Sequence, residues 1–207
     1  MNLLLVVATN EEAPSTPVPP EHAVGQHHIS ILVTGAGMVA TAYALGRHLS
    51  QHQYDLVINL GIAGALCRSL SIGDIVYVNE DCFIELGAED GDQFLSIDML
   101  GFGQSRYKAI PNSTALQFIH ELPEVSGITV NKVHGSEHSI ALLRQRTDAK
   151  VESMEGAAFY YSCHQANQPC VQLRAISNYV ERRNKAAWDI GKAIQSLHEF
   201  LHRRLAR

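Results

Sequence analysis

One acidic residue followed by small side chains marks the segment of this 207-residue chain with the most definite chemistry. Glu155 follows Ser153 and Met154, and residues 156–158 are Gly, Ala and Ala. A carboxylate can accept hydrogen bonds from two neighbouring sugar hydroxyls, while a methionine side chain packs on the face of the sugar. Ordinary helix capping also places an acid in a first turn. Small apolar residues after the acid are unusual on a solvated helix face, so we interpret Glu155 as a ligand-binding group.

Hydroxyl and amide groups follow the apolar run of residues 171–176, which contains Arg174. Ser177 and Asn178 come directly after it. An asparagine amide offers a donor and an acceptor together, which matches the oxo group of a 6-oxopurine and its neighbouring imidazole-side nitrogen. An asparagine in a plain turn is an equally good interpretation when this residue is taken alone. Arg183, a few residues further on, is a candidate to close over the same site.

Two glycines and two small or apolar residues follow the strand-like run of residues 55–59. They are Gly61, Ile62, Ala63 and Gly64. Their backbone amides could face a polar ligand, and the small side chains would let a flat ring approach the backbone. A compact turn is the alternative, and this motif alone does not separate the two. Together with the neighbouring motifs it favours a ligand.

Residues 35–40, Gly-Ala-Gly-Met-Val-Ala, fit a dinucleotide-binding fingerprint if alanine replaces the last glycine, and Asp55 follows about twenty residues later. In that fingerprint, however, the acidic residue ends the next strand, whereas Asp55 precedes the apolar run of residues 56–58. The fingerprint also belongs to the first strand–helix unit, and here it follows the second strand. A tight strand-to-helix turn explains the glycines equally well, so we expect no dinucleotide cofactor.

Strand-like and helix-like segments alternate along the chain, and this order predicts how the motifs are positioned. The alternation predicts a three-layer α/β/α single domain over residues 1–207, with a mixed, largely parallel central sheet. Ligands of such sheets bind where strands end and loops begin, and the motifs above fall at those ends. A polar stretch over residues 87–105 is expected to be a loop, and four prolines within residues 14–20 exclude a helix there. The expected strands are residues 3–7, 29–34, 55–59, 75–78, 127–134, 150–153 and 171–176, and the expected helices are residues 38–51, 113–121, 140–145, 155–166 and 186–204.

Composition excludes several classes of function. The net charge is −5, and Lys and Arg concentrate only in residues 203–207, so we expect no nucleic-acid binding. Four well-separated cysteines and scattered histidines lack the spacing of a zinc site, so we expect reduced thiols and no metal. No apolar run reaches membrane-spanning length, and residues 1–8 are too short for a secretory signal. We therefore expect a cytoplasmic protein that does not bind membranes.

Taken together, the motifs resemble the purine nucleoside phosphorylase and methylthioadenosine/adenosylhomocysteine nucleosidase superfamily. The similarity spans most of the chain, from the first strand with Glu12 through residues 35–39, 61–64, 72–76 and 154–155 to residues 174–178. Within that superfamily several stretches resemble the futalosine hydrolases in particular. These stretches are residues 85–90, 135–137, 152–159, 177–181, 183–184 and 188–189.

The resemblance implies a role for each motif residue. Glu155 matches the family glutamate that holds the ribose hydroxyls, and Met154 matches the methionine beside the sugar. Glu12 matches the glutamate that positions and deprotonates the attacking water. At position 178 adenine-cleaving relatives have Asp, whereas this chain has Asn178, as enzymes acting on 6-oxopurines do. Ile62 stands where the methylthioadenosine enzymes have Ser. The catalytic candidates are Glu12, Glu155 and Asn178, and the substrate-binding candidates are Gly61, Ile62, Ala63, Ser153, Met154, Arg174 and Arg183.

The resemblance therefore implies hydrolysis of the N-glycosidic bond of futalosine, which releases hypoxanthine and dehypoxanthine futalosine in menaquinone biosynthesis. It implies no cofactor and a homo-oligomer. Other interpretations stay open: cleavage of aminodeoxyfutalosine, methylthioadenosine or inosine, a phosphorylase of the same fold, or a non-catalytic nucleotide-binding module. One departure concerns Glu12, because a proline-rich stretch replaces the longer helical segment of relatives. If that shortening moves the loop, Glu11 is the nearest substitute.

Overall fold

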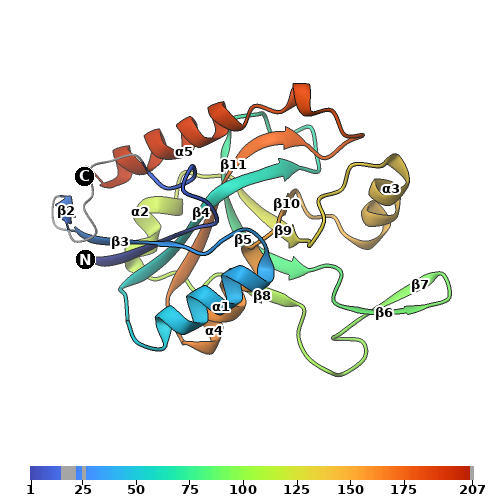
Figure 1. The fold of residues 1–207 in the computed structure, drawn as a ribbon, viewed down its shortest axis with the longest axis horizontal. Coiled ribbons are helices and arrows are strands. Elements are labelled where there is room, and N and C mark those ends of the chain that lie inside the picture. The colour runs from blue at the N-terminus through green and yellow to red at the C-terminus, as the bar shows by residue number, and fades with distance from the viewer. Residues whose placement is uncertain (15–21, 25–26, 206–207) are drawn as a thin grey trace.

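The computed structural model describes residues 1–14, 22–24 and 27–205. Over these residues nine strands form one sheet, in the order β10-β9-β5-β11-β4-β1-β3-β2, with β8 paired to β5 (Figure 1). The strands of this sheet are β1 (Asn2–Val7), β2 (His22–Val24), β3 (His27–Val33), β4 (Leu56–Ala65), β5 (Ile75–Phe83), β8 (Arg106–Lys108), β9 (Glu124–Thr129), β10 (Val151–Ser153) and β11 (Cys170–Tyr179).

Parallel pairing dominates the centre of the sheet. β1 pairs in parallel with β3 and β4, and β11 pairs in parallel with β4, so their carboxyl ends meet at one edge. β5 runs antiparallel to β11 and parallel to β9. The short β10 pairs with β9 and also with β4, so β10, β9, β5, β11 and β4 close a ring. This is the mixed, largely parallel sheet that the sequence predicts.

Helices cover both faces of the sheet and complete three layers, which confirms the predicted fold class. In Figure 1, α5 lies along one face, and α1 and α4 lie side by side on the other. Buried side chains of α2 and α5 form one core with β1, β4 and β11, and those of α1 and α4 form a second core on the opposite face. The helices are α1 (Met38–Leu49), α2 (Ser113–Ile119), α3 (Glu137–Arg146), α4 (Gly156–Gln165) and α5 (Ile190–Leu205), with a 3₁₀ turn at Lys185–Ala187.

Local side-chain hydrogen bonds fix where several helices begin. Asn112 and Ser136 each accept a backbone N–H of the first helical turn and so cap α2 and α3. Asp189 accepts from the backbone N–H of Lys192 at the start of α5. This cap explains why the last helix begins at Ile190 and not at residue 186, where the periodicity alone had placed it.

The prediction of a loop over residues 87–105 was wrong for the first half of this stretch. Gly87–Asp90 (β6) and Gln93–Ser96 (β7) pair as an antiparallel hairpin that projects from the body of the molecule (Figure 1). Gly91 has a φ of 61° between the two strands, a conformation that glycine adopts without strain. The strands were not predicted because β6 is exposed and β7 is only half-buried, so neither has the alternating pattern of a strand with one buried face.

Glycines were also misread as strand ends. β4 continues through Gly61 and Gly64 to Ala65, and β11 extends past Ile176 to Tyr179 across an irregular register. The strand expected at residues 127–134 is instead Glu124–Thr129, with Gly127 in its interior. The prediction from the prolines falls mostly on residues 15–20, which lie outside the described residues. No helix in the described part of the chain is both long and apolar enough to cross a membrane.

Candidate active site

Glu12 lies in the turn after β1 and is buried, with only 6% of its surface exposed. Its carboxylate accepts hydrogen bonds from the backbone N–H groups of Ala8 (3.2 Å) and Thr9 (3.1 Å). It also accepts one from the backbone N–H of Ile62 on β4, at 3.2 Å. Because β1 and β4 are parallel neighbours, these contacts hold the carboxylate at the edge where both strands end. The short connection after Glu12 therefore leaves its side chain at this edge.

Glu155 is the residue immediately before α4, and it too is buried. Its Oε1 accepts a hydrogen bond from the backbone N–H of Gly37 at 2.9 Å. Gly37 precedes α1, so the carboxylate lies where the N-termini of two helices approach each other. The positive ends of the two helix dipoles favour the ionised carboxylate there. Gly37 has a φ of 94°, which suits glycine and aims its N–H at Glu155.

Arg174 on β11 connects the regions of the two glutamates. Its guanidinium is 1% exposed and donates to Gln172 Oε1 (2.8 Å) and Asn59 Oδ1 (2.6 Å). Arg174 Nη2 lies 3.8 Å from Glu155 Oε2. A Cβ atom added to Gly61 would lie 2.1 Å from Arg174 Nη1 and 3.0 Å from an oxygen of Glu12.

The Arg174 guanidinium and the Glu12 carboxylate therefore both lie over Gly61, and Glu155 lies beside the guanidinium. This glycine is required by that close approach, because no side chain has room there.

A buried polar network that was not predicted from the sequence holds Gln172, the residue that binds Arg174 Nε. Asp81 on β5 accepts hydrogen bonds from Gln172 Nε2 (3.0 Å) and Thr129 Oγ1 (2.8 Å). Burial raises the pKa of Asp81 to about 6, although these hydrogen bonds and the charge of Arg174 lower it. The Thr129 hydroxyl also accepts from the backbone N–H of Ala157 in the first turn of α4. The alternation of Gln172 and Arg174 with apolar residues on β11 was the only signal for this network in the sequence.

Asn178 lies near the end of β11, beyond the irregularity in register that follows Ile176. Its Oδ1 accepts from the Ser177 hydroxyl at 2.8 Å, and its Nδ2 donates to the backbone carbonyl of Tyr179 at 3.0 Å. It is half-buried and pairs with Gly64 on β4. A Cβ atom on Gly64 would lie 3.2 Å from Asn178 Nδ2, so the amide is close to the backbone of the predicted glycine motif.

The remaining predicted residues differ in how close they lie to the two glutamates. Ile62 and Ala63 lie on β4 next to Gly61, and Ser153 and Met154 immediately precede Glu155. Ser153 is buried and Met154 is half-buried. Arg183 is exposed, its backbone N–H donates to the carbonyl of Gly135, and its guanidinium lies 5.0 Å from the centre of the Trp188 ring.

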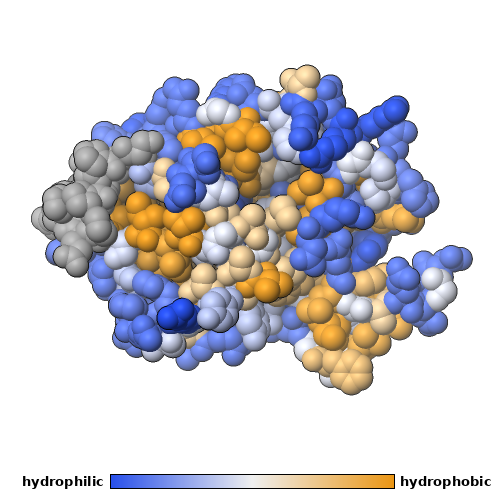
Figure 2. Space-filling view, in the orientation of Figure 1, coloured by the Kyte–Doolittle hydropathy of each residue, from blue (hydrophilic) through white to orange (hydrophobic). Residues whose placement is uncertain are grey.

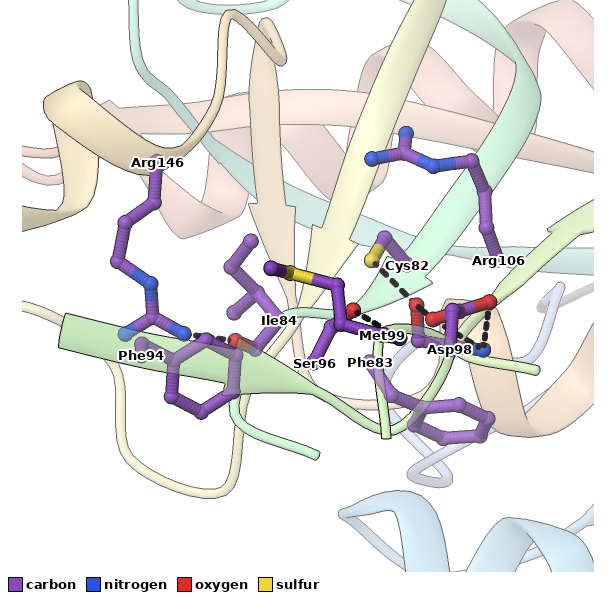
Figure 3. A pocket seen from close by; sticks show the side chains of 10 residues that line it. Cys82, Phe83, Ile84, Phe94, Ser96, Asp98, Met99, Arg106 and Arg146 are labelled. Carbon is purple, nitrogen blue, oxygen red and sulfur yellow. Dashed lines mark hydrogen bonds between the residues drawn. The ribbon is translucent and has the colours of Figure 1, made fainter. Parts of the chain in front are cut away.

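A separate cavity of about 420 Å³ lies under the hairpin β6–β7 (Figure 3). In it the Arg146 guanidinium stacks over the Phe94 ring, 3.7 Å from the ring centre. Asp98 lies at the opposite side of the cavity from Arg146. None of the predicted site residues lines this cavity. Within the described residues, no group of three or more His, Cys, Asp and Glu side chains is arranged to hold a metal ion.

Comparison with known proteins places the chain in a family. Residues 21–207 match the model of the phosphorylase superfamily. The chain is 35% identical to a futalosine hydrolase of Acidothermus cellulolyticus over 178 residues, which are 82% of this chain and 72% of that protein. It is 32% identical to a futalosine hydrolase of Thermus thermophilus over 84% of this chain and 80% of that protein. Identity to a futalosine hydrolase of Streptomyces coelicolor is 33% over 72% of this chain, and that match spans only 64% of the relative.

Solved structures share the fold at lower identity. A 5'-methylthioadenosine/S-adenosylhomocysteine nucleosidase of Helicobacter pylori superposes with a TM-score of 0.83 at 18% identity, over 99% of this chain and 97% of that one. A futalosine hydrolase of the same organism superposes with a TM-score of 0.81 at 17% identity, over the same shares of the two chains. The chain therefore belongs to the phosphorylase superfamily and, within it, to the family of the futalosine hydrolases.

Proposed function

We propose that this protein hydrolyses the N-glycosidic bond of futalosine and releases hypoxanthine and dehypoxanthine futalosine, as a step of menaquinone biosynthesis in the cytoplasm. One observation carries the proposal: the buried Arg174 guanidinium lies 3.8 Å from the carboxylate of Glu155 and shares the space above Gly61 with the buried carboxylate of Glu12. A binding module has no need of two buried acids in the neighbourhood of one buried cation. The name shared by the curated relatives supports the choice of substrate.

The reaction passes through an oxocarbenium-like state, with positive charge on the sugar and negative charge on the departing base. Glu155, which keeps one oxygen on the Gly37 N–H, would bind the ribose hydroxyls with the other and stabilise the sugar cation. Glu12 would take a proton from the attacking water, a contribution of about 10²- to 10⁴-fold. Arg174 would attract the Glu155 carboxylate, and its own orientation is fixed by its hydrogen bonds to Asn59 and Gln172.

The base would lie over the end of β4, beside Asn178. The Asn178 amide, half-buried near Gly64, can bond the oxo group and a ring nitrogen of hypoxanthine after exchanging its local partners. Ile62 offers no hydroxyl at the position where methylthioadenosine enzymes have serine, which favours the 6-oxopurine substrate. The further substrate contacts that we propose come from Gly61, Ala63, Ser153, Met154 and Arg183.

One assay separates the candidate functions. The purified protein is given futalosine, aminodeoxyfutalosine, inosine or methylthioadenosine, each with and without inorganic phosphate, and the release of free base is followed. We expect hypoxanthine from futalosine at a rate that does not depend on phosphate. A requirement for phosphate would instead show a phosphorylase, and no base from any substrate would show a binding module. Preference for an aminopurine substrate would overturn the assignment of Asn178.

We also propose that two copies of the chain associate through the face formed by α1 and α4. Val39, Tyr43 and Tyr161 are 78%, 70% and 40% exposed on these helices, beside a largely apolar groove of about 570 Å³. Figure 2 shows further apolar side chains on the projecting region that contains the hairpin. Exposed apolar clusters of this kind mark interaction sites. Tyr43→Asp should convert a dimer into a monomer in analytical ultracentrifugation, and a wild-type protein that sediments as a monomer would refute the proposal.

A further inference from the structure

A row of three residues crosses the sheet beside the proposed position of the base. Glu152 on β10 pairs with Gly64 on β4, and the same Gly64 pairs with Asn178 on β11. Residues directly opposite each other on neighbouring strands share a face of the sheet. Strands lie about 4.8 Å apart, so the backbones at Glu152 and Asn178 are separated by about 10 Å, with a glycine between them.

The side chain of Glu152 binds His134, which lies in the loop between β9 and α3. The backbone N–H of His134 donates to Glu152 Oε1 at 2.9 Å, and the imidazole Nδ1 donates to Glu152 Oε2. The two side chains are 12% and 2% exposed. A carboxylate that binds Nδ1 fixes the orientation of an imidazole ring and stabilises its imidazolium form, in which Nε2 also has a proton to donate.

The Nε2 atom of His134 is unpartnered yet accessible. It forms no hydrogen bond with any residue that the structure describes. It is also absent from the fully buried, unsatisfied side-chain atoms of those residues, of which Gln117 Nε2 is the one example. A buried carboxylate thus fixes one nitrogen of the ring, while the other is free to meet a ligand.

The loop that carries His134 meets the chain segment that follows Asn178. The carbonyl of Gly135 accepts a hydrogen bond from the backbone N–H of Arg183 at 3.0 Å. A Cβ atom on Gly135 would lie 3.2 Å from Arg183 Cβ, so the two segments are in direct contact. His134 and Asn178 therefore flank the same end of β4 from opposite sides.

We propose that His134 is the general acid that protonates the departing purine, with Glu152 as its positioning residue. This inference rests on the proposed nucleosidase activity. A neutral amide at position 178 can bond the base but cannot give it a full proton. As the bond between the sugar carbon and the purine nitrogen breaks, its electron pair stays on the base, and the His134 Nε2 proton moves to a purine nitrogen. The water oxygen bonds to the sugar carbon and its proton goes to Glu12, after which Glu12 releases that proton to solvent and His134 takes one from solvent.

The titratable and charged groups around the ring come from several elements. Glu152 faces it from β10, and Glu85, after β5, accepts from the backbone N–H of Asn131 in the same loop and acts on Glu152. Burial raises the pKa of Glu152, while its hydrogen bonds with His134 lower it. Lys132 lies in the same loop. Glu137 lies at the start of the adjoining α3, and Arg183 lies in the segment after β11.

The decisive variant is His134→Asn, because the Asn amide can still donate to Glu152 but has no group at the position of Nε2. We expect kcat for the purine nucleoside that the wild type cleaves to fall about 10²- to 10⁴-fold. In the wild type kcat should fall as pH rises and the imidazolium loses its proton, and this alkaline limb should vanish in the variant. Glu152→Gln should shift that limb to lower pH, because the neutral amide no longer stabilises the imidazolium.

A second substrate separates an acid from a structural role. Futalosine methylated at N7 carries a positive charge, so its base leaves as a neutral molecule without being protonated. His134→Asn should cleave it nearly as fast as the wild type does, and His138→Gln, an exposed residue on α3, should leave both substrates unaffected. Equal losses on the two substrates, or an unchanged alkaline limb, would overturn the role of His134. If the wild type cleaves no purine nucleoside at all, the proposed function itself fails.

Discussion

Arg174 Nη2 lies 3.8 Å from Glu155 Oε2, and both side chains are buried. The separation is too long for a hydrogen bond, and the guanidinium is held instead by Asn59 and Gln172. Its charge therefore acts on Glu155 without occupying the carboxylate oxygen that faces it. That oxygen stays available to a ligand, while Oε1 is fixed by the Gly37 N–H. The geometry explains how a buried acid can be held in place by the protein and still be ready to bind hydroxyl groups.

Glu155→Gln should lower kcat for the cleaved nucleoside by about 10²- to 10³-fold, the usual cost of removing one electrostatic stabiliser of a transition state. The Gln Oε1 can still accept from Gly37, so the fold should be retained, which circular dichroism and the melting temperature would report. Glu199→Gln, on the exposed side of α5, is the matched control and should behave as wild type. Normal turnover by a folded Glu155→Gln protein would remove Glu155 from the mechanism.

Gly61→Ala should disable the site by pushing Arg174 aside. The added Cβ would lie 2.1 Å from the buried Nη1, so the guanidinium must move or the strand must shift. We expect kcat/KM to fall more than 10²-fold, with a loss of about 1–3 kcal/mol in the free energy of unfolding from overpacking.

Gly46→Ala is the control for this substitution, because Gly46 lies in α1 with no neighbouring atom within 4 Å of the added Cβ. It should raise the free energy of unfolding by about 0.5–1 kcal/mol and leave kcat/KM unchanged. Equal activity of Gly61→Ala and Gly46→Ala would show that Arg174 need not occupy its present position.

The sequence predicted the layers well because buried parallel strands and amphipathic helices leave strong periodic patterns, as in residues 3–7 and α1. It placed strand ends badly wherever glycine occurs. Gly61 was expected to lie beyond the end of a strand and Gly127 to begin one, but each lies inside a strand, where a side chain from elsewhere, Arg174 or Asp81, occupies the space above it. Such an approach comes from residues distant in the sequence, so no local pattern contains it.

The same limit applies to the site. Glu155 and Asn178 stand out because their neighbours in the chain are unusual, and the resemblance supplied Glu12. Asp81, Gln172 and Thr129 were missed, since each is an ordinary polar residue in its own strand and only the sheet register brings them together. Where β5, β9 and β11 pair, their polar side chains must satisfy one another, because water cannot reach them.

Asn178→Asp should shift selectivity from 6-oxopurine to 6-aminopurine substrates. An amide offers both a donor and an acceptor to the base, whereas an ionised carboxylate only accepts, and a protonated one can transfer its proton. The ratio of kcat/KM for futalosine to that for its 6-amino analogue should fall at least tenfold. An unchanged ratio in a variant that still turns over would show that Asn178 does not contact the base.

Asp81 should make stability depend on pH in a direction opposite to that of most carboxylates. Burial raises its pKa to about 6 in the folded protein, against an ordinary value of 3.8. The neutral form is therefore favoured in the folded state, and the stability it contributes is complete below the ordinary pKa and is lost as pH rises through about 6. Relative to Asp81→Asn, which does not titrate, the wild-type free energy of unfolding should fall by about 2 kcal/mol between pH 4 and pH 7. Urea unfolding of both proteins across this range measures the difference.

Asp92→Asn, in the exposed hairpin, is the control, and its free energy of unfolding should vary with pH in parallel with that of the wild type. If the free energy of unfolding of Asp81→Asn also runs parallel to wild type, the buried carboxyl ionises at its ordinary pH.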